Sequence, residues 1–355
     1  MDDHDSEDQG PSAQAPAISV VVVAYRSGPD LLDCVRSVLE GEPRAELVLV
    51  DNGAAGDEVT RAASLGAQVV GNGTNLGFAA GCNLGASAAA APVLVFLNPD
   101  TTIEPGALTK LASVVSADQS VGSAMAVVLL PDGSTNTSGN FIHLTGHGWS
   151  GGFGEPPPDG SEPFEVTYPS GAAMAMRSDT FGELGGFCEP YFLYHEDLEL
   201  GWRIRLEGMR NVAVPDARVV HDYEYGRNAT KFRHIERNRL LFLLTCLPTP
   251  LLLAVAPLVL ALEAATLVLA TAQGWLADKL WGYRWILGHP GWILRRRREV
   301  LRRRRATDAQ LADELRPRLD PAMPGAPVVP AVANHAMATW WRLLRGVFGH
   351  GPAGT

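Results

Sequence analysis

Two short stretches of the sequence place carboxylates where they could do chemistry. In "VLVFLNPD" (residues 93–100), five apolar residues run directly into Asn98, Pro99 and Asp100. In "YFLYHEDLE" (residues 191–199), Glu196 and Asp197 follow a cluster of aromatic residues. An isolated Asp after a strand is most often a turn former or a helix cap. A catalytic or metal-binding role therefore depends on what surrounds each acid.

The residues after Asp197 have the spacing of a helix. Leu198, Trp202 and Leu206 recur every four positions and share one helical face. Glu196 and Asp197 are then expected in the first turn, where acids also stabilise a helix by about 0.3–1 kcal/mol. Aromatic neighbours exclude water from a carboxylate and raise its pKa, which makes it a better proton acceptor near neutral pH. The pattern is compatible with helix capping and with a general base.

A histidine ends a later apolar run. "VAVPDARVVH" has the pattern of a strand and closes on His221. A histidine after a strand is most often structural. If it meets Asp100 in space, however, the two side chains could ligate a metal ion.

These side chains need elements that bring them together. Apolar, β-branched runs predict strands over residues 17–25, 45–53, 67–73 and 92–100. Helical patterns separate and follow them, and this alternation predicts an α/β fold with a doubly wound, mostly parallel sheet. Ligands of such sheets bind at the carboxyl ends of the strands. The polar residues at three of these ends, Tyr25, Asp51 and Asp100, are therefore expected to converge.

Two glycine-rich segments have other interpretations. The glycines of "GNGTNLG" (71–77) do not fit G-x-G-x-x-G and follow the third strand, so we exclude a classical dinucleotide site. Residues 130–170 are rich in Gly, Pro, Ser and Thr. A segment of this length is either a substrate lid or a plain surface loop.

Composition and charge divide the chain. The first 230 residues carry a balance of -20 and the last 125 a balance of +10, within a total of -10. Four scattered cysteines without metal spacing, and no signal peptide, favour a reduced cytosolic setting. The acidic, Pro- and Ala-rich start of the chain is expected to be disordered.

The basic part also holds the longest apolar stretch. Leu240–Leu262 has 23 residues without a charge, enough to span a bilayer, but its prolines argue against one straight helix. Eight arginines follow within residues 295–305. Such a cluster suits anionic lipid headgroups. A buried pair of helices is the alternative for the apolar stretch, and no nucleic-acid motif accompanies the arginines, so we expect membrane contact and no nucleic-acid partner.

Seven motifs in order resemble the family 2 glycosyltransferases, especially their bacterial rhamnosyltransferase-like branch. They are the strand ending in "AY", then "LVLVDNG", "GNGTNLGFAAGCNLG", "FLNPD", "SGAAMAMR", "GGFCEPYFLYHEDLELGWRIRLEG" and "VPDARVVH". The resemblance covers residues 18–245. It implies a GT-A fold, a nucleotide-sugar donor, a divalent metal (Mg²⁺ or Mn²⁺) and an inverting mechanism.

The resemblance also implies roles for single residues. Asp197 would be the catalytic base, with Glu196 beside it. Asn98-Pro99-Asp100 stands for the D-x-D motif, so metal ligation would fall to Asp100 and His221. The residues that it places around the donor are Tyr25, Asp51, Asn75 and Asn98.

We therefore expect a disordered tail over 1–17, a glycosyltransferase domain over 18–239, a membrane-associated helical region over 240–305 and a C-terminal tail over 306–355. The expected function is sugar transfer, with rhamnose from dTDP-rhamnose as first candidate, to a glycan or lipid-linked acceptor in cell-envelope polysaccharide synthesis. The expected location is the cytoplasmic side of the cell membrane. The alternatives are an inactive sugar-nucleotide-binding or scaffold protein, disfavoured because Asp197 is present, and a nucleotidyltransferase, disfavoured because the first strand lacks a basic Gly-rich signature.

Overall fold

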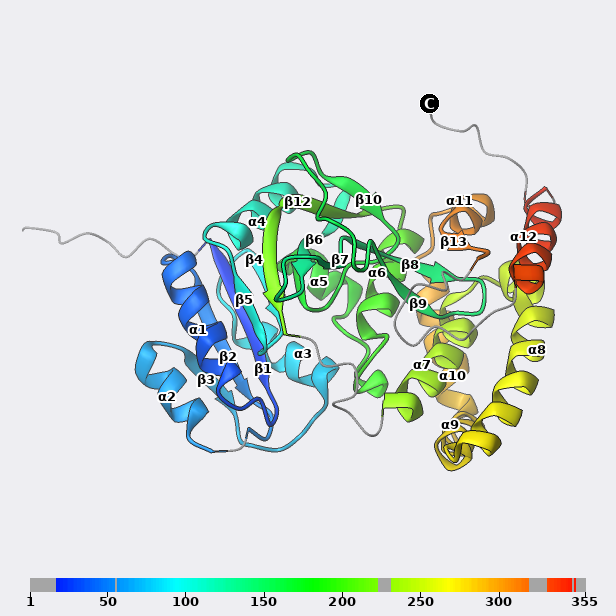
Figure 1. Cartoon of the computed structure of the whole chain (residues 1–355), viewed down its shortest axis with the longest axis horizontal. Helices are drawn as coiled ribbons and strands as arrows, with labels where there is room; N and C mark the ends of the chain where they lie inside the picture. The colour runs from blue at the N-terminus through cyan, green and yellow to red at the C-terminus, as the bar shows by residue number, and fades with distance from the viewer. Residues whose placement is uncertain (1–16, 55, 223–230, 319–330, 347, 349–355) are drawn as a thin grey trace, which may run out of the picture.

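A computed structural model describes residues 17–54, 56–222, 231–318, 331–346 and 348. A twisted sheet lies at the centre of the molecule, and helices from the last third of the chain gather at one end, far from the first helices (Figure 1). The tail predicted over 1–17 falls almost entirely outside the described residues.

The central sheet is mixed and mostly parallel, as predicted. Its strands run in the order β10-β12-β6-β11-β4-β1-β2-β3, with β5 and β7 paired at the side. The pairs β1/β2, β1/β4, β2/β3 and β6/β12 are parallel, whereas β11 is antiparallel to both β4 and β6. The bounds are β1 Ile18–Ala24, β2 Glu46–Asp51, β3 Gln68–Gly71, β4 Val93–Leu97, β5 Thr101–Ile103, β6 Val121–Leu129, β7 Thr135–Thr137, β10 Phe164–Val166, β11 Ala173–Arg177 and β12 Arg210–His221.

Alternate residues of the strands contribute to two hydrophobic layers, one on each face of the sheet. In β1, Val20 and Val22 face one layer, and Val21 and Val23 face the other. Helices α1 and α4 cover the first layer, and helices α3, α5 and α6 cover the second. Both faces of β1 are therefore buried, which is why its sequence is a continuous apolar run. The helix bounds are α1 Asp30–Gly41, α2 Glu58–Leu65, α3 Phe78–Ala88, α4 Ala107–Ala117, α5 Ser178–Leu184 and α6 Glu196–Leu206.

The Gly/Pro-rich segment 130–170 contains strands and is not a plain loop. Besides β7 and β10, it forms β8 (Gly139–His143) and β9 (Gly148–Gly151). Together with β13 (Leu315–Arg316) they form a second, three-stranded sheet, in which β8 lies between β13 and β9. Short strands separated by glycine turns lack a long apolar run, so the sequence pattern does not reveal them.

The predicted apolar stretch is divided between two helices. α7 (Lys231–Cys246) ends just before Pro248, and α8 (Thr249–Gln273) then runs for 25 residues through Pro257. Among the described helices α8 is the one long and apolar enough to cross a bilayer, by length and composition alone. The remaining helices are α9 (Leu276–Gly288), α10 (Pro290–Arg302), α11 (Asp308–Asp313) and α12 (Ala331–Arg345), with a one-turn 3₁₀ helix, η1, at Glu189–Tyr191.

α7 belongs to the body of the molecule. Its Phe242 packs edge-on against Trp202 of α6, with ring centroids 5.6 Å apart. The Trp202 indole N–H donates to the carbonyl of Cys246 at 3.2 Å. All four cysteines are free thiols in buried positions. The hydrophobic core thus continues across the division at 239/240 that the sequence suggested.

Part of the arginine cluster faces inward. Arg296 forms a 2.6 Å ion pair with the fully buried Glu199 of α6. Arg297 donates to the carbonyls of Leu244 and Leu247 at the end of α7. Because α10 packs against α7, these guanidinium groups hold the helices together and are not available to lipid.

Candidate active site

The Glu196-Asp197 pair lies at the start of α6, behind a loop with an unusual backbone. Phe192, Tyr194 and His195 all have positive φ, between 66° and 68°. Non-glycine residues rarely adopt this conformation, and when they do they cluster at functional sites. The loop turns the first residues of α6 toward the carboxyl edge of the sheet.

Asp197 is held by two backbone N–H groups. Its Oδ2 accepts from Gly171 at 3.0 Å and its Oδ1 from Leu198 at 2.7 Å. Burial raises the pKa of Asp197, and these hydrogen bonds oppose that rise. The result is a fixed carboxylate that accepts a proton more readily than an exposed Asp does.

Glu196 is the more buried of the two, with 5% of its surface exposed. Burial, and then the charge of Asp197, raise its pKa well above the ordinary value. Its Oε2 makes no hydrogen bond to any residue that the structure describes. Two adjacent carboxyl groups that cannot both ionise easily are typical of sites that transfer protons.

Strand pairing brings Asp100 and His221 together. β5 pairs antiparallel with the end of β12, and His221 lies opposite Thr101. The Nε2 atom of His221 is 3.0 Å from Oδ1 of Asp100 and 3.4 Å from the amide nitrogen of Asn98. The contact between Asp100 and His221, raised as a possibility from the sequence, is thus present.

The chemistry of this pair suits a divalent cation. A carboxylate oxygen and an imidazole nitrogen are both ligands of Mn²⁺, and Mg²⁺ commonly takes one or two protein carboxylates and completes its shell with water and phosphate. Within the described residues there is no group of three or more His, Cys, Asp or Glu side chains that could enclose a metal alone. Asp100 and His221 would therefore hold an ion whose other ligands come from a substrate.

A second polar group lies at the ends of β1 and β2. Asp51 lines an open cavity of about 360 Å³ together with Gly71, Asn72, Thr74, Leu76 and Leu84. Its Oδ1 accepts from the N–H groups of Gly53 and Ala54. Tyr25 is 42% exposed, and the guanidinium of Arg26 lies 5.3 Å from the centre of its ring.

Asn75 and Asn52 shape the loop beside this cavity. The Asn75 Oδ1 accepts from the N–H of Gly77 at 3.0 Å. Asn52 is buried; its amide lies 3.4 Å from Asn75 Oδ1, and its Oδ1 accepts from Leu76 N–H at 2.8 Å. The sequence analysis did not single out Asn52, although its place directly after Asp51 was the available signal.

Backbone contacts connect the two groups along one edge of the sheet. The N–H of Asn98 donates to the carbonyl of Ala172, whose neighbour Gly171 binds Asp197. The N–H of Ala79 donates to the carbonyl of Phe192. A side chain at Gly77 would overlap the Phe192 ring, since an added Cβ would lie 2.5 Å from it. The strand-end motifs and the loop before Asp197 thus form one surface.

Residues of α7 brace this loop, and the sequence analysis missed them. The amide of Asn238 donates to the carbonyls of Tyr191, Leu193 and Tyr194 at 2.6–2.9 Å. Arg237 donates to those of Pro190 and Tyr191, both at 2.8 Å. The signal was a run of charged and amide residues, "RHIERNR", that leads directly into an apolar helix.

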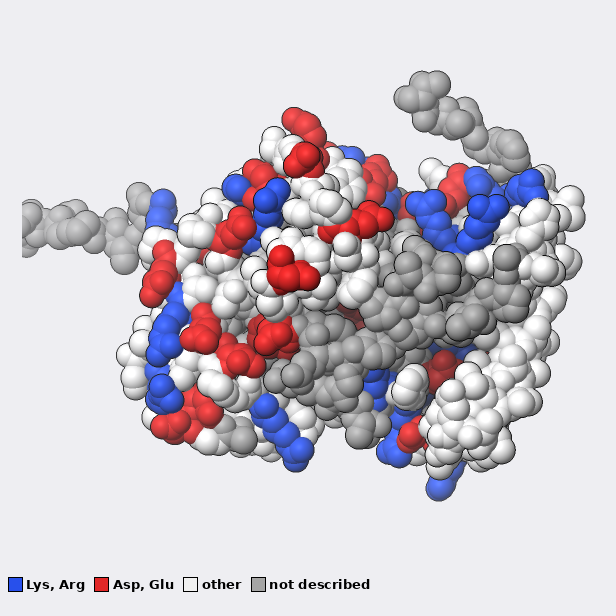
Figure 2. Space-filling model, in the orientation of Figure 1, with Lys and Arg blue, Asp and Glu red and all other residues white. Residues whose placement is uncertain are grey.

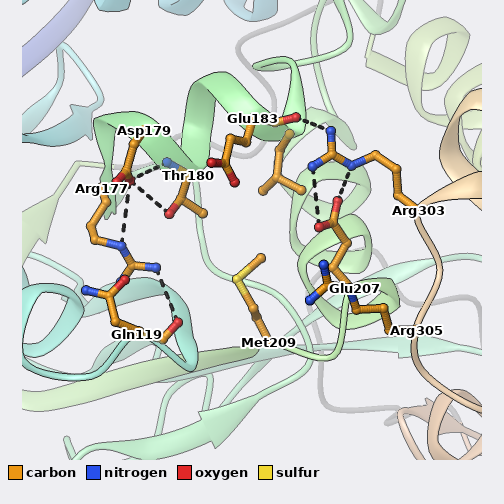
Figure 3. A pocket seen from close by; sticks show the side chains of 10 residues that line it. Gln119, Arg177, Asp179, Thr180, Glu183, Glu207, Met209, Arg303 and Arg305 are labelled. Carbon is orange, nitrogen blue, oxygen red and sulfur yellow. Dashed lines mark hydrogen bonds and ion pairs between the residues drawn. The ribbon is translucent and has the colours of Figure 1, made fainter.

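A second cavity, of about 230 Å³, lies at the other edge of the sheet (Figure 3). Arg177, in its wall, ends β11 opposite Val93, the first residue of β4. Across the cavity Arg303 pairs with Glu207 and donates to the carbonyl of Glu183. Its basic groups are largely engaged in holding the chain together, and it contains none of the site residues expected from the sequence.

The chain is similar to known glycosyltransferases. Residues 19–185 match the model of Glycosyl transferase family 2. The chain is 30% identical over 246 residues to an N-acetylglucosaminyl-diphospho-decaprenol L-rhamnosyltransferase of Mycobacterium tuberculosis, covering 61% of this chain and 80% of that protein. It is 29% identical over 155 residues to the O-antigen biosynthesis protein RfbC of Myxococcus xanthus, covering 41% of this chain and 12% of that protein.

A solved structure supports the fold. The crystal structure of GalNAc-T7 with UDP, GalNAc and Mn²⁺ superimposes with a TM-score of 0.54 and 19% identity, over 64% of this chain and 48% of that one. At that identity the match bears on the fold alone, which is the expected GT-A type. By the extent of its similarity to the mycobacterial enzyme, this chain belongs to glycosyltransferase family 2 and transfers a sugar from a nucleotide donor.

Proposed function

We propose that the protein is an inverting glycosyltransferase with Asp197 as its catalytic base. The observation that carries the proposal is the placement of Asp197, fixed by two backbone N–H groups and joined through Gly171–Ala172 to the strand-end motif of Asn98 and Asp100. A base in this position removes the proton from an acceptor hydroxyl as its oxygen attacks the anomeric carbon. The nucleoside diphosphate leaves from the opposite face, so one displacement inverts the configuration.

The other residues would bind the donor. Asp51 lines the cavity that suits the nucleoside, and Tyr25 is exposed just after the neighbouring strand β1. Asn75 and Asn98 would contact the rest of the donor, Asn98 beside His221. Asp100 and His221 would hold a divalent cation, whose charge offsets the negative charge of the leaving diphosphate. Glu196 stays beside the base and influences its protonation.

We infer that the donor is dTDP-rhamnose and that the acceptor is a glycan or a lipid-linked sugar of cell-envelope polysaccharide synthesis. The similarity to an enzyme named for rhamnose transfer to a decaprenol-linked acceptor supports both choices. The basic C-terminal part and the long apolar α8 support attachment to the cytoplasmic side of the cell membrane, where such an acceptor would be found.

A transfer assay tests the proposal. Purified protein with Mn²⁺ is offered dTDP-rhamnose, UDP-galactofuranose, GDP-mannose or UDP-N-acetylglucosamine, with a polyprenyl-diphosphate-linked GlcNAc acceptor. We expect release of dTDP and a rhamnosylated lipid of inverted configuration. Transfer from another donor would reject rhamnose but keep the mechanism, whereas release of pyrophosphate would contradict the mechanism as well.

A further inference from the structure

The long apolar helix α8 is fixed to the protein along one side. Near its start Leu251 and Val255 are fully buried in a cluster with Trp202 and Phe242. The Trp340 indole N–H of α12 donates to the carbonyl of Ala254 at 3.1 Å. Near its end Ala270 is also fully buried. From residue 251 to residue 270 the helix extends about 28 Å.

The middle of α8 is fixed by charge. Glu263 pairs with Arg239 of α7, and its Oε2 lies 3.0 Å from Nζ of Lys279 in α9. The Tyr283 hydroxyl donates to the same carboxylate. Arg239 and Lys279 are buried within the protein and bridge to Glu236 as well. The one acid of α8 therefore faces inward, toward α7 and α9.

The opposite side of α8 carries exposed apolar residues. Leu253 and Leu260 are each 68% exposed, and Val268 is 72% exposed. Their spacing of seven and eight residues places them on one face of a helix. Leu280 of α9 and Leu343 of α12 add to the same end of the molecule. In the space-filling view this flank is a band of uncharged atoms, with basic side chains above it near α12 and below it near α9 (Figure 2).

The charges of this region suit an anionic surface. Exposed arginines of the neighbouring helices include Arg284, Arg298 and Arg342. The acids of α9 and α10, Asp278 and Glu299, are each paired with an arginine. The last 125 residues carry +10 and the first 230 carry -20, so an anionic bilayer would attract this end and repel the other.

From these contacts we infer that α8 lies in the plane of the membrane, with the face of Leu253, Leu260 and Val268 inserted into one leaflet of an anionic bilayer. A helix crossing the bilayer would be surrounded by lipid over about 30 Å. That would draw Arg239 and Lys279 into the hydrocarbon with it, where charges are costly. An in-plane helix buries its apolar face and leaves these contacts intact. The inference deepens the membrane attachment proposed above and rests on it.

Depth measurement separates the two orientations. In the full-length protein Leu253→Cys, Leu260→Cys and Val268→Cys are labelled one at a time with a fluorophore, which is selective because the native cysteines are buried. Quenching is measured in phosphatidylglycerol/phosphatidylcholine vesicles that contain lipids spin-labelled at a shallow or a deep acyl position. The first and last sites are about 22 Å apart along the helix. We expect one shallow depth for all three, whereas a deep Leu260 between shallow ends would overturn the inference and leave membrane attachment standing.

Binding provides the second arm. We expect a triple variant with Leu253→Glu, Leu260→Glu and Val268→Glu to bind vesicles more weakly. Each substitution should lower the affinity at least about tenfold, because that apolar side chain is no longer buried in the lipid. Leu65→Glu, an exposed leucine of α2 that is 43% exposed, is the matched control and should leave binding unchanged. Donor-induced thermal stabilisation should persist in all variants. The inference would be overturned if the wild-type protein did not bind anionic vesicles at low salt, or if the substitutions dissociated a dimer. Vesicle binding without sugar transfer would count against the proposed function only.

Discussion

At the scale of single residues, Asp197 differs from another aspartate, Asp179, that also lies at the start of a helix. Asp197 lies at the start of α6 with both carboxylate oxygens bonded to N–H groups, and Asp179 lies at the start of α5 with its side chain 73% exposed. We expect Asp197→Asn to lower the transfer rate about 10²–10⁴-fold, the usual cost of losing a general base. Donor binding, followed by thermal shift, should be nearly unchanged. Asp179→Asn is the control, and a variant of Asp197 with wild-type turnover would refute its role.

The same carboxylate predicts a pH dependence. Because burial raises the pKa of Asp197, the base becomes protonated at a higher pH than an exposed aspartate, whose pKa is about 3.9. Protonation removes its ability to accept the acceptor's proton, so activity should fall as the pH decreases through the raised pKa. The measurement is kcat/KM between pH 4 and 8. An acid limb at or below that of an exposed aspartate would show that Asp197 is not the ionising base.

The metal assignment is tested at Asp100 and His221. We expect Asp100→Ala and His221→Ala each to weaken Mn²⁺ binding, measured calorimetrically with a nucleoside diphosphate, by at least about tenfold. Asp222 is the neighbouring exposed carboxylate, and Asp222→Asn should keep the affinity. The reverse pattern would move the site to Asp222.

At the scale of elements, α7 has two functions that the sequence analysis did not separate. Its apolar residues fill the core beside Trp202, and its polar residues bind the backbone of the loop before Glu196. That loop has three non-glycine residues with positive φ, a conformation that persists only where its surroundings enforce it. We propose that Asn238 acts on catalysis through the loop, as a positioning residue.

We therefore predict that Asn238→Ala lowers kcat even under conditions where the variant remains folded. The KM for the donor should change little. Three carbonyls lose a donor, of which that of Tyr191 keeps a bond from Arg237. Each carbonyl left buried and unsatisfied costs about 1–3 kcal/mol. Asn83 is a matched control, because it binds the backbone of Phe187, earlier in the same segment, through similar hydrogen bonds. Asn83→Ala should lower the melting temperature with a smaller effect on kcat. Equal effects of both variants on kcat would indicate a general loss of stability.

The elements also show what the sequence can predict. Continuous apolar runs specify β1, β2 and β4. Strands buried on both faces are apolar throughout, and this pattern can be recognised in the local sequence without knowing which elements pack against them. The brace by Asn238 and the turn of Arg296 toward Glu199 depend on which helices pack together. Such contacts join residues 44 to 97 positions apart, and local periodicity carries no information about them. For the same reason Asp197 was predictable as a candidate, whereas its bond to Gly171 was not.

At the scale of the whole molecule, the C-terminal helices are part of the catalytic body. The hydrophobic cluster around Trp202 draws residues from α6, α7, α8 and α11. The buried ion pairs of Arg239 and Lys279 join α7, α8 and α9. A division at 239/240 would cut through α7 and expose this core. Experiments on the active site therefore require the full-length chain.

A group of histidines, of which His143 is buried and His147 and His195 are half-buried, links these helices to the loop before Glu196. The ring of His143 lies 2.8 Å from the Thr145 hydroxyl, which is 3.0 Å from His147. His147 is 3.6 Å from a carboxylate oxygen of Glu236 on α7. The ring of His195, next to Glu196, contacts the carbonyl of Gly146 at 3.3 Å. Burial is the main cause that lowers the pKa of His143 and of His195, each to about 3.

These shifts predict that the folded protein loses stability in mild acid. A histidine with a pKa of about 6.5 when unfolded and about 3 when folded binds its proton preferentially in the unfolded state between those values. The free energy of unfolding should then fall as the pH decreases from about 6.5 toward 3, by up to about 1.4 kcal/mol per pH unit for each such histidine. Urea denaturation at pH 4 to 7 measures the slope. His143→Gln should reduce this slope by the contribution of about one proton. His335→Gln, at an exposed position of α12, should leave the slope unchanged. An unaltered slope in the His143 variant would show that His143 does not contribute to this acid sensitivity.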